Sequence, residues 1–143
     1  MNIKQIAIFL ENKKGRLADV AKALSAAGVN IRALSLAETT DFGVLRLIVN
    51  DPDKAAAELK KAGFVAQLTD VIAVEVEDKP GGLSRILDVF DRHDINIEYM
   101  YAFVEKRVEN AVVIFKIDEK EKAHAALKEA GIPVVTSDVL KNL

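Results

Sequence analysis

The residues with the clearest chemical potential lie in two short polar segments, each of which comes after an apolar stretch and contains glycine. They read Glu11-Asn12-Lys13-Lys14-Gly15-Arg16-Leu17 and Glu77-Asp78-Lys79-Pro80-Gly81-Gly82-Leu83. If a helix begins after each glycine, its free backbone N–H groups and its dipole attract a carboxylate. The side-chain oxygen of Asn12 or Asp78 could then accept a hydrogen bond from an ammonium group. Each segment could therefore hold an amino acid, although Asn, Asp and Gly also cap helices and form turns.

The composition argues against several classes of function. The chain has 143 residues, a net charge of -2 and no cysteine, which excludes thiolate catalysis, disulfides and cysteine metal sites. Two histidines, His93 and His124, leave little for a histidine metal site, so we expect no metal and no cofactor. The slight excess of acidic residues argues against nucleic acid as a partner. No apolar run approaches the ~18 residues of a membrane span, and Ile6–Leu10 is too short for a signal peptide. We therefore expect a cytoplasmic protein without a membrane partner.

The chain contains two tandem copies of one sequence repeat. At an offset of about 66 residues, Ile6-Ala7 falls on Ile72-Ala73 and Asn30-Ile31 falls on Asn96-Ile97. The two polar segments match each other at the same offset, and Thr69-Asp70-Val71 resembles Ser137-Asp138-Val139 at a slightly larger one. The sequence thus predicts two domains, residues 1–69 and 70–143, which pack together because no Pro/Gly/Ser-rich linker separates them.

Within each repeat, the spacing of apolar residues and the turn residues predict the order strand, helix, strand, strand, helix, strand. Strands are expected at 3–10, 29–37, 44–49, 64–68, 71–76, 95–104, 111–117 and from Pro133 onward. Helices are expected over 17–24, after the Asp51-Pro52 start signal, over 83–90 and over 123–130, the last of the chain. This order is that of an α+β ferredoxin-like βαββαβ plait, an antiparallel sheet with helices on one face.

The face of the sheet away from the helices is expected to be apolar. Strict alternation along the strands places a mixed but mostly apolar set of residues there: Asn30, Arg32, Leu34, Leu36, Val44, Arg46, Ile48, Met100, Val112 and Ile114. The same alternation groups Ile95, Ile97, Tyr99, Tyr101 and Phe103 on one face, as core or as the wall of a ligand site. Because so apolar a surface is unfavourable in water, we expect a homodimer.

Three kinds of function remain open from the residues. The first is a ligand-binding regulatory protein, and the second is an interaction module that acts on a separate enzyme. The third is a small plait enzyme that uses Arg16 on a phosphate-like substrate, but the matching residue in the second repeat is Gly82. No nucleophile–base pair or metal cluster is visible, so catalysis is not predicted.

Each polar segment, together with the helix and the strand expected after it, resembles the ACT domain pattern. Asp78-Lys79-Pro80-Gly81-Gly82-Leu83, one helix and then Ile95-Asn96-Ile97 carry the resemblance in the second repeat. Asn12-Lys13-Lys14-Gly15-Arg16-Leu17 and Val29-Asn30-Ile31 carry it in the first, with Lys14 where proline is usual. The resemblance covers nearly the whole chain as two tandem copies.

This resemblance implies a non-catalytic regulatory protein that binds a small effector, usually an amino acid, at an interface between ACT domains. It implies domains that pack side by side and ligand contacts from eight residues: Asn12, Gly15, Leu17, Asn30, Asp78, Gly81, Leu83 and Asn96. Asn30 and Asn96 are expected beside the loop of their own repeat. The chain is also similar to tandem ACT proteins that regulate acetolactate synthase, which implies the alternative of a regulatory subunit or interaction module of an enzyme of amino-acid metabolism.

Overall fold

The computed structural model describes residues 3–38, 41–103 and 110–142. These residues form two compact units, each with its own core. One unit comprises Lys4–Thr69, and the other comprises Ile3 and the described residues from Asp70 onward. Each unit has the order βαββα and then a strand, which confirms the predicted pair of ferredoxin-like plaits.

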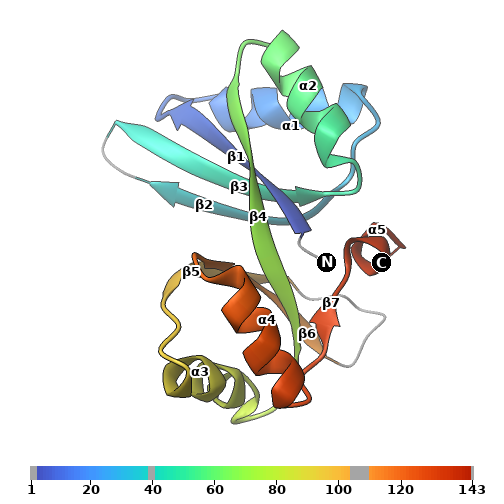
Figure 1. Cartoon of the computed structure of the whole chain (residues 1–143). Helices are drawn as coiled ribbons and strands as arrows, with labels where there is room; N and C mark the ends of the chain where they lie inside the picture. The colour runs from blue at the N-terminus through green and yellow to red at the C-terminus, as the bar shows by residue number, and fades with distance from the viewer. Residues whose placement is uncertain (1–2, 39–40, 104–109, 143) are drawn as a thin grey trace. The chain divides into compact units, whose positions relative to one another are not determined.

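The first unit carries its strands in the hydrogen-bonded order β2-β3-β1-β4 (Figure 1). β1 and β2 both pair antiparallel with β3, which lies between them. The elements in chain order are β1 (Ile3–Glu11), α1 (Arg16–Ala26), β2 (Ile31–Glu38), β3 (Phe42–Val49), α2 (Pro52–Lys61) and β4 (Val65–Val76). The sheet therefore has the plait topology, with β2 as an edge strand.

The second unit repeats this topology with β6 between β4 and β5, and with the short β7 on the other side of β4. The remaining elements are α3 (Gly82–Arg92), β5 (Ile97–Phe103), β6 (Ala111–Ile117), α4 (Lys120–Glu129), β7 (Val134–Val135) and α5 (Ser137–Asn142). Residue 104, the expected end of the strand predicted over 95–104, lies outside the described residues.

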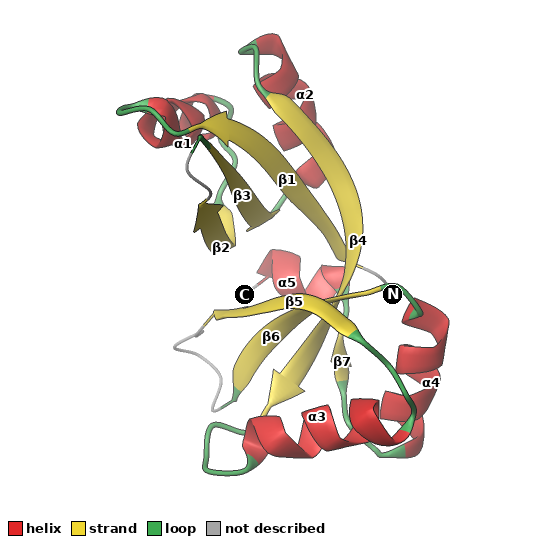
Figure 2. Cartoon of the chain, turned by 90° about the vertical axis from the view of Figure 1, so that its left-hand side faces the viewer, coloured by secondary structure: helices red, strands yellow, loops and turns green. Residues whose placement is uncertain are grey.

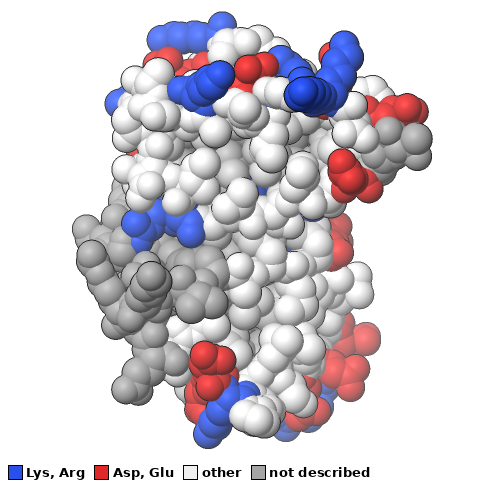
Figure 3. Space-filling model, turned by 180° about the vertical axis from the view of Figure 1, so that it is seen from behind, with Lys and Arg blue, Asp and Glu red and all other residues white. Residues whose placement is uncertain are grey.

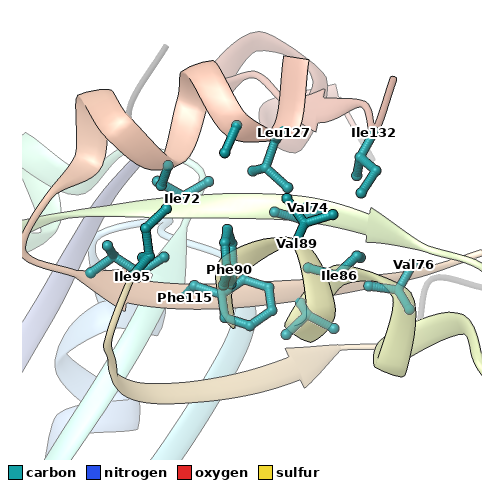
Figure 4. Packing of buried hydrophobic residues seen from close by; sticks show 14 residues of the cluster. Ile72, Val74, Val76, Ile86, Val89, Phe90, Ile95, Phe115, Leu127 and Ile132 are labelled. Carbon is teal, nitrogen blue, oxygen red and sulfur yellow. The ribbon is translucent and has the colours of Figure 1, made fainter. Parts of the chain in front are cut away.

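In each unit the two helices of the repeat cover one face of the sheet, as Figure 2 shows for α1 and α2 over β1 and β3. Val20 and Leu24 of α1 and Leu59 of α2 are buried with Ile6, Ile8, Leu45 and Leu47 of the sheet. The second core has the same construction, with Ile86 and Phe90 of α3 and Leu127 of α4 on Ile72, Val74 and Phe115 (Figure 4). Burial of these apolar stripes accounts for the placement of the helices.

Local signals fix the helix ends. The side chain of Asp51 accepts a hydrogen bond from the Lys54 N–H (3.2 Å) and caps α2, and Pro52 comes next at the first turn. Gly28, with φ of 72°, ends α1 in a Schellman arrangement. The N–H groups of Gly28 and Val29 there donate to the carbonyls of Ser25 and Leu24. The predicted stop at Gly28 and start at Asp51 are both confirmed.

The strands on the two sides of the predicted repeat boundary differ from the prediction. The strands expected at 64–68 and 71–76 are one continuous strand, β4, which runs from Val65 to Val76. No glycine or proline interrupts this stretch, and Thr69, Asp70 and Val71 stay extended through the repeat boundary. The first repeat therefore ends, and the second begins, inside a single strand.

The prediction that the helix over 123–130 is the last helix is wrong. A further short helix, α5, spans Ser137–Asn142, and its Leu140 is only 3% exposed. The Val139 N–H donates to the Thr136 hydroxyl (3.4 Å), so Thr136 caps this helix. The resemblance between residues 69–71 and 137–139 is therefore not structural, because the first lies in a strand and the second in a helix.

The strict alternation of side chains between the two faces of the sheet is interrupted at equivalent places in β2 and β5. The register shifts by one residue between Ile31 and Ala33 in β2 and between Ile97 and Tyr99 in β5, as in a β-bulge. Beyond each shift the faces are exchanged. Leu34 and Leu36 pair with Leu47 and Leu45, and Met100 pairs with Phe115, so all three lie on the helix side. Their predicted place on the helix-free face is therefore wrong.

The same shift separates Ile97 from Tyr99 and Tyr101. Ile97 pairs with Ile117 of the core, whereas Tyr99 and Tyr101 pair with Lys116 and Ile114 on the helix-free face. The predicted grouping of these apolar and aromatic residues on one face is thus also wrong.

The helix-free face does not offer the open apolar surface that the sequence indicated. Ile48, Val112 and Ile114 lie there as predicted, but they are 1%, 3% and 0% exposed in the single chain. Gln5, on the same face of β1, is buried as well. The homodimer expected from this face stays a prediction. Among the described residues, no helix is long and apolar enough to cross a membrane.

Candidate functional site

The loop between the first strand and the first helix has the same glycine conformation and the same turn hydrogen bond in both repeats. Gly15 has φ and ψ of 88° and -13°, and Gly81 has 87° and -9°. Both φ values lie in the left-handed region that favours glycine. The Arg16 N–H donates to the Lys13 carbonyl (3.3 Å) and the Gly82 N–H to the Lys79 carbonyl (3.0 Å). Each loop is thus a tight turn that leads directly into a helix.

The helices after these loops begin without a side-chain cap. Neither α1 nor α3 receives a side-chain hydrogen bond at its N-cap, a glycine in both cases, whereas Asp51 caps α2. α4 also begins without a side-chain cap, at Glu119. Uncapped first-turn N–H groups can bind an anionic group such as a carboxylate.

The same arrangement of charge flanks the loop in both repeats. Lys13 Nζ lies 2.8 Å from Glu11 Oε2, and Lys79 Nζ lies 2.6 Å from Glu77 Oε2. These hydrogen bonds lower the pKa of the Glu11 and Glu77 carboxyls below the usual value. The positive charge of each lysine is therefore partly neutralised by the glutamate at the start of its own loop.

The predicted loop residues are accessible. Leu17 is 44% exposed and Leu83 is 37% exposed, both on the first turn of a helix. Asn12 and Asp78 are exposed too. The Asn12 N–H donates to the Asp41 carbonyl (3.0 Å), so the first loop lies beside the β2–β3 hairpin. Each loop thus presents a polar side chain, a glycine turn and a leucine to solvent.

Asn30 and Asn96 do not lie beside the loop of their own repeat, contrary to expectation. Asn30 exchanges hydrogen bonds with Asn50: its N–H donates to Asn50 Oδ1 (3.0 Å), and its carbonyl accepts from the Asn50 N–H (3.2 Å). Asn50 comes after the end of β3, whereas Asn12 comes after the end of β1 and lies beside the start of β3. The length of β2 therefore separates Asn30 from Asn12. Asn96 lines a shallow depression with Asp91, Asp94 and Ile95, away from Gly81.

A cavity of about 520 Å³ lies next to the second loop, inside the second unit. It is bounded by the end of β4, the loop, the start of α3 and the turn after α4. Its lining carries four charged side chains, those of Glu75, Glu77, Lys79 and Arg85, together with Pro80, Gly81, Gly82, Ile86, Asn110, Gly131, Ile132 and Pro133. Of the eight predicted ligand residues, only Gly81 belongs to this lining.

The corresponding loop of the first unit borders a hollow of about 380 Å³, lined by Glu11, Asn12, Lys13, Asp41 and Phe42, and a second one of about 60 Å³. Asn12 and Leu17 line the second one, together with Leu10, Arg16, Leu36 and other residues of the loop and the hairpin. Gly15 and Asn30 are not part of this lining. The exchange of faces in β2 places Leu36 here, which alternation in the sequence did not indicate.

Charged side chains of both signs are mixed on one face of the molecule. On the face seen in Figure 3, Lys and Arg side chains lie among Asp and Glu side chains and form no continuous basic patch among the described residues. Within the same part of the chain, no group of three His, Cys, Asp or Glu side chains could hold a metal ion.

Comparison with known proteins finds relatives along the full chain. The family model described as an ACT domain pair matches residues 1–141. A protein of known crystal structure from Bacteroides thetaiotaomicron is 38% identical, with 100% of this chain and 98% of that chain covered and a TM-score of 0.94. No curated protein matches.

More distant structures share the fold. The regulatory subunit of aspartate kinase from Thermus flavus has a TM-score of 0.62 at 18% identity, over 92% of this chain and 94% of that one. The ligand-free regulatory subunit from Thermus thermophilus has the same TM-score and identity, over 89% and 91%. At this level of identity the likeness is one of fold.

Proposed function

We propose, from the premise that this chain belongs to the family of ACT domain pairs, that it is a non-catalytic regulatory protein that binds an amino acid. The observation that carries the proposal is the loop shared by the two repeats. Both loops have the same left-handed glycine, and both lead into a helix without a side-chain cap. Because both repeats retain the loop in this form, we infer that the two loops are suited to bind the same kind of ligand.

Each loop offers groups for the three parts of an amino acid. The first-turn N–H groups of α1 or α3 would bind the carboxylate. Asn12 Oδ1 or the Asp78 carboxylate would accept from the ammonium group. Leu17 and Leu83, both exposed, would cover an apolar side chain. Because Asp78 carries a charge that Asn12 lacks, the two loops would differ in affinity.

Thermal unfolding in the presence of each common amino acid tests this proposal. A ligand present at about 100 times its dissociation constant adds about 2.7 kcal/mol to the free energy of unfolding. For a chain of this size that corresponds to a rise in Tm of several degrees. We expect a selective rise with one amino acid or a small group of them. No rise with any amino acid would contradict the proposal.

Substitutions in the loops identify which loop binds. Of the two variants Asn12→Ala and Asp78→Ala, the one in the loop that binds should reduce the rise in Tm produced by the amino acid, because it removes the acceptor for the ammonium group. Asn50→Ala serves as a control, since Asn50 lies at the other end of the first sheet and makes its hydrogen bonds with Asn30. Equal ligand responses in all three variants would place the site elsewhere.

A second candidate is a module that associates with a second copy of itself or with an enzyme of amino-acid metabolism. Leu34 and Leu36 are 57% and 46% exposed on the edge strand β2, and the nearby Phe42 is 58% exposed. An apolar edge strand is a surface to which another chain can add. Light scattering separates monomer from homodimer, and Leu34→Lys with Leu36→Lys should dissolve an association through this edge.

A further inference from the structure

The two repeats differ most where the helix after the first loop meets the turn after the second helix. In the first repeat this place is filled by a side chain. The Arg16 guanidinium lies over the Phe64 ring, with Cζ 4.6 Å from the ring centroid, and Arg16 Nε is buried. Nη1 of the same guanidinium lies 3.6 Å from Asp19 Oδ2. The Arg16 side chain, held by the Phe64 ring and by Asp19, therefore fills this part of the first unit.

In the second repeat, Gly82 takes the place of Arg16, and Ile132, directly after the glycine that ends the second helix, takes the place of Phe64. Both residues line the cavity of about 520 Å³. A Cβ atom on Gly82 would collide with the backbone carbonyl of Glu77. Residue 82 can therefore not fill the cavity with a side chain of its own unless the loop moves. The second repeat thus keeps open a space that the first repeat fills.

The charged groups around this cavity have both signs. Lys79 is engaged by Glu77 at 2.6 Å. Arg85 is more weakly held, because its Nη1 lies 4.0 Å from Glu77 Oε1 and its Nη2 donates to the Ala130 carbonyl (3.2 Å). Its side chain is 56% exposed and can turn toward a bound molecule. Arg85 is therefore the cation best suited to bind an incoming carboxylate.

Glu75 supplies the opposite charge. It lies near the end of β4, lines the cavity, and accepts a hydrogen bond from Asn110 Nδ2 at 3.1 Å through Oε1. A carboxylate can accept further hydrogen bonds in addition to this one, and the hydrogen bond from a charged ammonium group is stronger than one from a neutral donor. The apolar part of the lining, Ile86, Ile132 and Pro133, suits a short side chain.

We propose that this cavity binds one zwitterionic amino acid per chain, with its carboxylate on Arg85 and its ammonium group on Glu75. The inference rests on the proposed amino-acid-binding function but limits it to the second repeat, and it assigns the ligand to Arg85 and Glu75 in place of the first-turn N–H groups and Asp78. The first repeat has no counterpart, because Arg16 and Phe64 occupy the equivalent place and Asp19 stands where Arg85 does.

Isothermal titration calorimetry of the full chain with each common amino acid is the test. We expect one ligand per chain. Arg85→Gln and Glu75→Gln should each weaken binding about tenfold or more, the value of a hydrogen bond to a charged group. Gln at 75 can still accept from Asn110, and Arg85→Lys should restore part of the affinity. Asp19→Asn, at the position of Arg85 in the first repeat, is the matched control and should bind as the wild type does.

The outcomes separate this inference from the proposed function. If an amino acid binds and neither Arg85→Gln nor Glu75→Gln weakens it, the cavity is not the site, while the regulatory function stands. Two ligands per chain would overturn the assignment to the second repeat alone. If no amino acid binds the wild type, both proposals are wrong. Unfolding midpoints of the variants, measured without ligand, distinguish lost binding from lost folding.

Discussion

Phe90 of α3 meets Phe115 of β6 edge to face, with ring centroids 5.2 Å apart and ring planes at 86°. Both rings are fully buried in the centre of the second core, which Figure 4 shows. Edge-to-face aromatic pairs contribute beyond the area they bury. This contact joins the helix after the second loop to the middle of the sheet, so it holds the loop in place.

Removal of the Phe90 ring should destabilise the folded chain. Phe90→Ala leaves a cavity against Phe115 and should lower the free energy of unfolding by about 3–5 kcal/mol. Ser84→Ala, on an exposed position of the same helix, should change it by less than about 0.5 kcal/mol. Urea unfolding measured by circular dichroism quantifies both. A cost for Phe90→Ala as small as that of Ser84→Ala would contradict the packing of the two rings.

Gly82 and Gly81 are adjacent, but their substitution should have different costs. Gly81→Ala places a side chain in open space and costs only the left-handed backbone, about 1–2 kcal/mol. Gly82→Ala forces a Cβ against the Glu77 carbonyl, so the loop must move. We expect Gly82→Ala to lower the free energy of unfolding by about 3 kcal/mol, near the upper end of the range for ordinary substitutions. Unfolding curves that place Gly81→Ala below Gly82→Ala in stability would contradict this order.

The contact between Arg16 and Phe64 should stabilise the first unit. Arg16→Ala removes both the cation–π contact and the packing of the side-chain stem, with an expected cost of about 1–2 kcal/mol. Arg92→Ala removes an exposed arginine whose Nε lies 3.3 Å from Asp88, and should cost less than about 0.5 kcal/mol. The comparison is made by thermal unfolding of the two variants at the same pH. Equal costs would show that Arg16 is only a surface residue.

The cap of α2 offers a matched pair of aspartates. Asp51 accepts from the Lys54 N–H, and Asp51→Ala should cost about 1 kcal/mol. Asp53, two residues later, forms an exposed ion pair with Lys4 at 3.3 Å, so Asp53→Ala should cost a few tenths of a kcal/mol. Denaturant midpoints of both variants test this. The same loss in both would mean that charge at this helix end, and not the cap, is responsible.

The stability of the chain should depend on the protonation of His124. Burial lowers the pKa of His124 below its usual value of 6.5. The unfolded chain therefore binds a proton more readily than the folded chain, and the free energy of unfolding should decrease as the pH falls from above 6.5 through the folded pKa. His124→Gln should lose less stability over the same interval. Urea unfolding at about pH 8 and about pH 5 compares the two, and parallel losses would contradict the assignment.

Much of the fold could be predicted because its signals are local. Asp51-Pro52 marks the start of α2, Gly28 marks the end of α1, and the strand predicted over 111–117 matches β6 at both ends. α5 also had a local signal, since Thr136 is a good N-cap residue and Leu140 provides an apolar contact. The similarity of residues 137–139 to residues 69–71 is one of sequence alone, since the first set lies in a helix and the second in a strand.

The register shifts in β2 and β5 had no such signal. Arg32 and Glu98, the residues at the two shifts, are ordinary strand residues, and neither a glycine nor a proline marks the place. A shift of one residue exchanges all later side chains between the two faces. The error in placing Leu34, Leu36 and Met100 therefore comes from one residue in each strand.

The candidate site was predictable only in part. The loops with Gly15 and Gly81 could be found from the repeat, because glycine and polar residues recur at the same offset. The cavity could not, because it depends on the lack of a side chain at Gly82 and on the approach of Glu75, Arg85 and Ile132 from three different parts of the chain. Such an approach is a property of the tertiary structure. The difference between Arg16 and Gly82 was nevertheless visible in the sequence, in loops that otherwise match.

The continuity of β4 determines how the chain can be dissected in the laboratory. A cut between Thr69 and Asp70 would divide a strand of twelve residues, Val65–Val76, and leave each fragment with only part of it. Incomplete strands expose unpaired backbone groups, and fragments that carry them tend to aggregate. A truncated protein made from either repeat should therefore include the whole of Val65–Val76. Loss of ligand binding in a fragment cut at the repeat boundary would report damage to the sheet and not the location of the site.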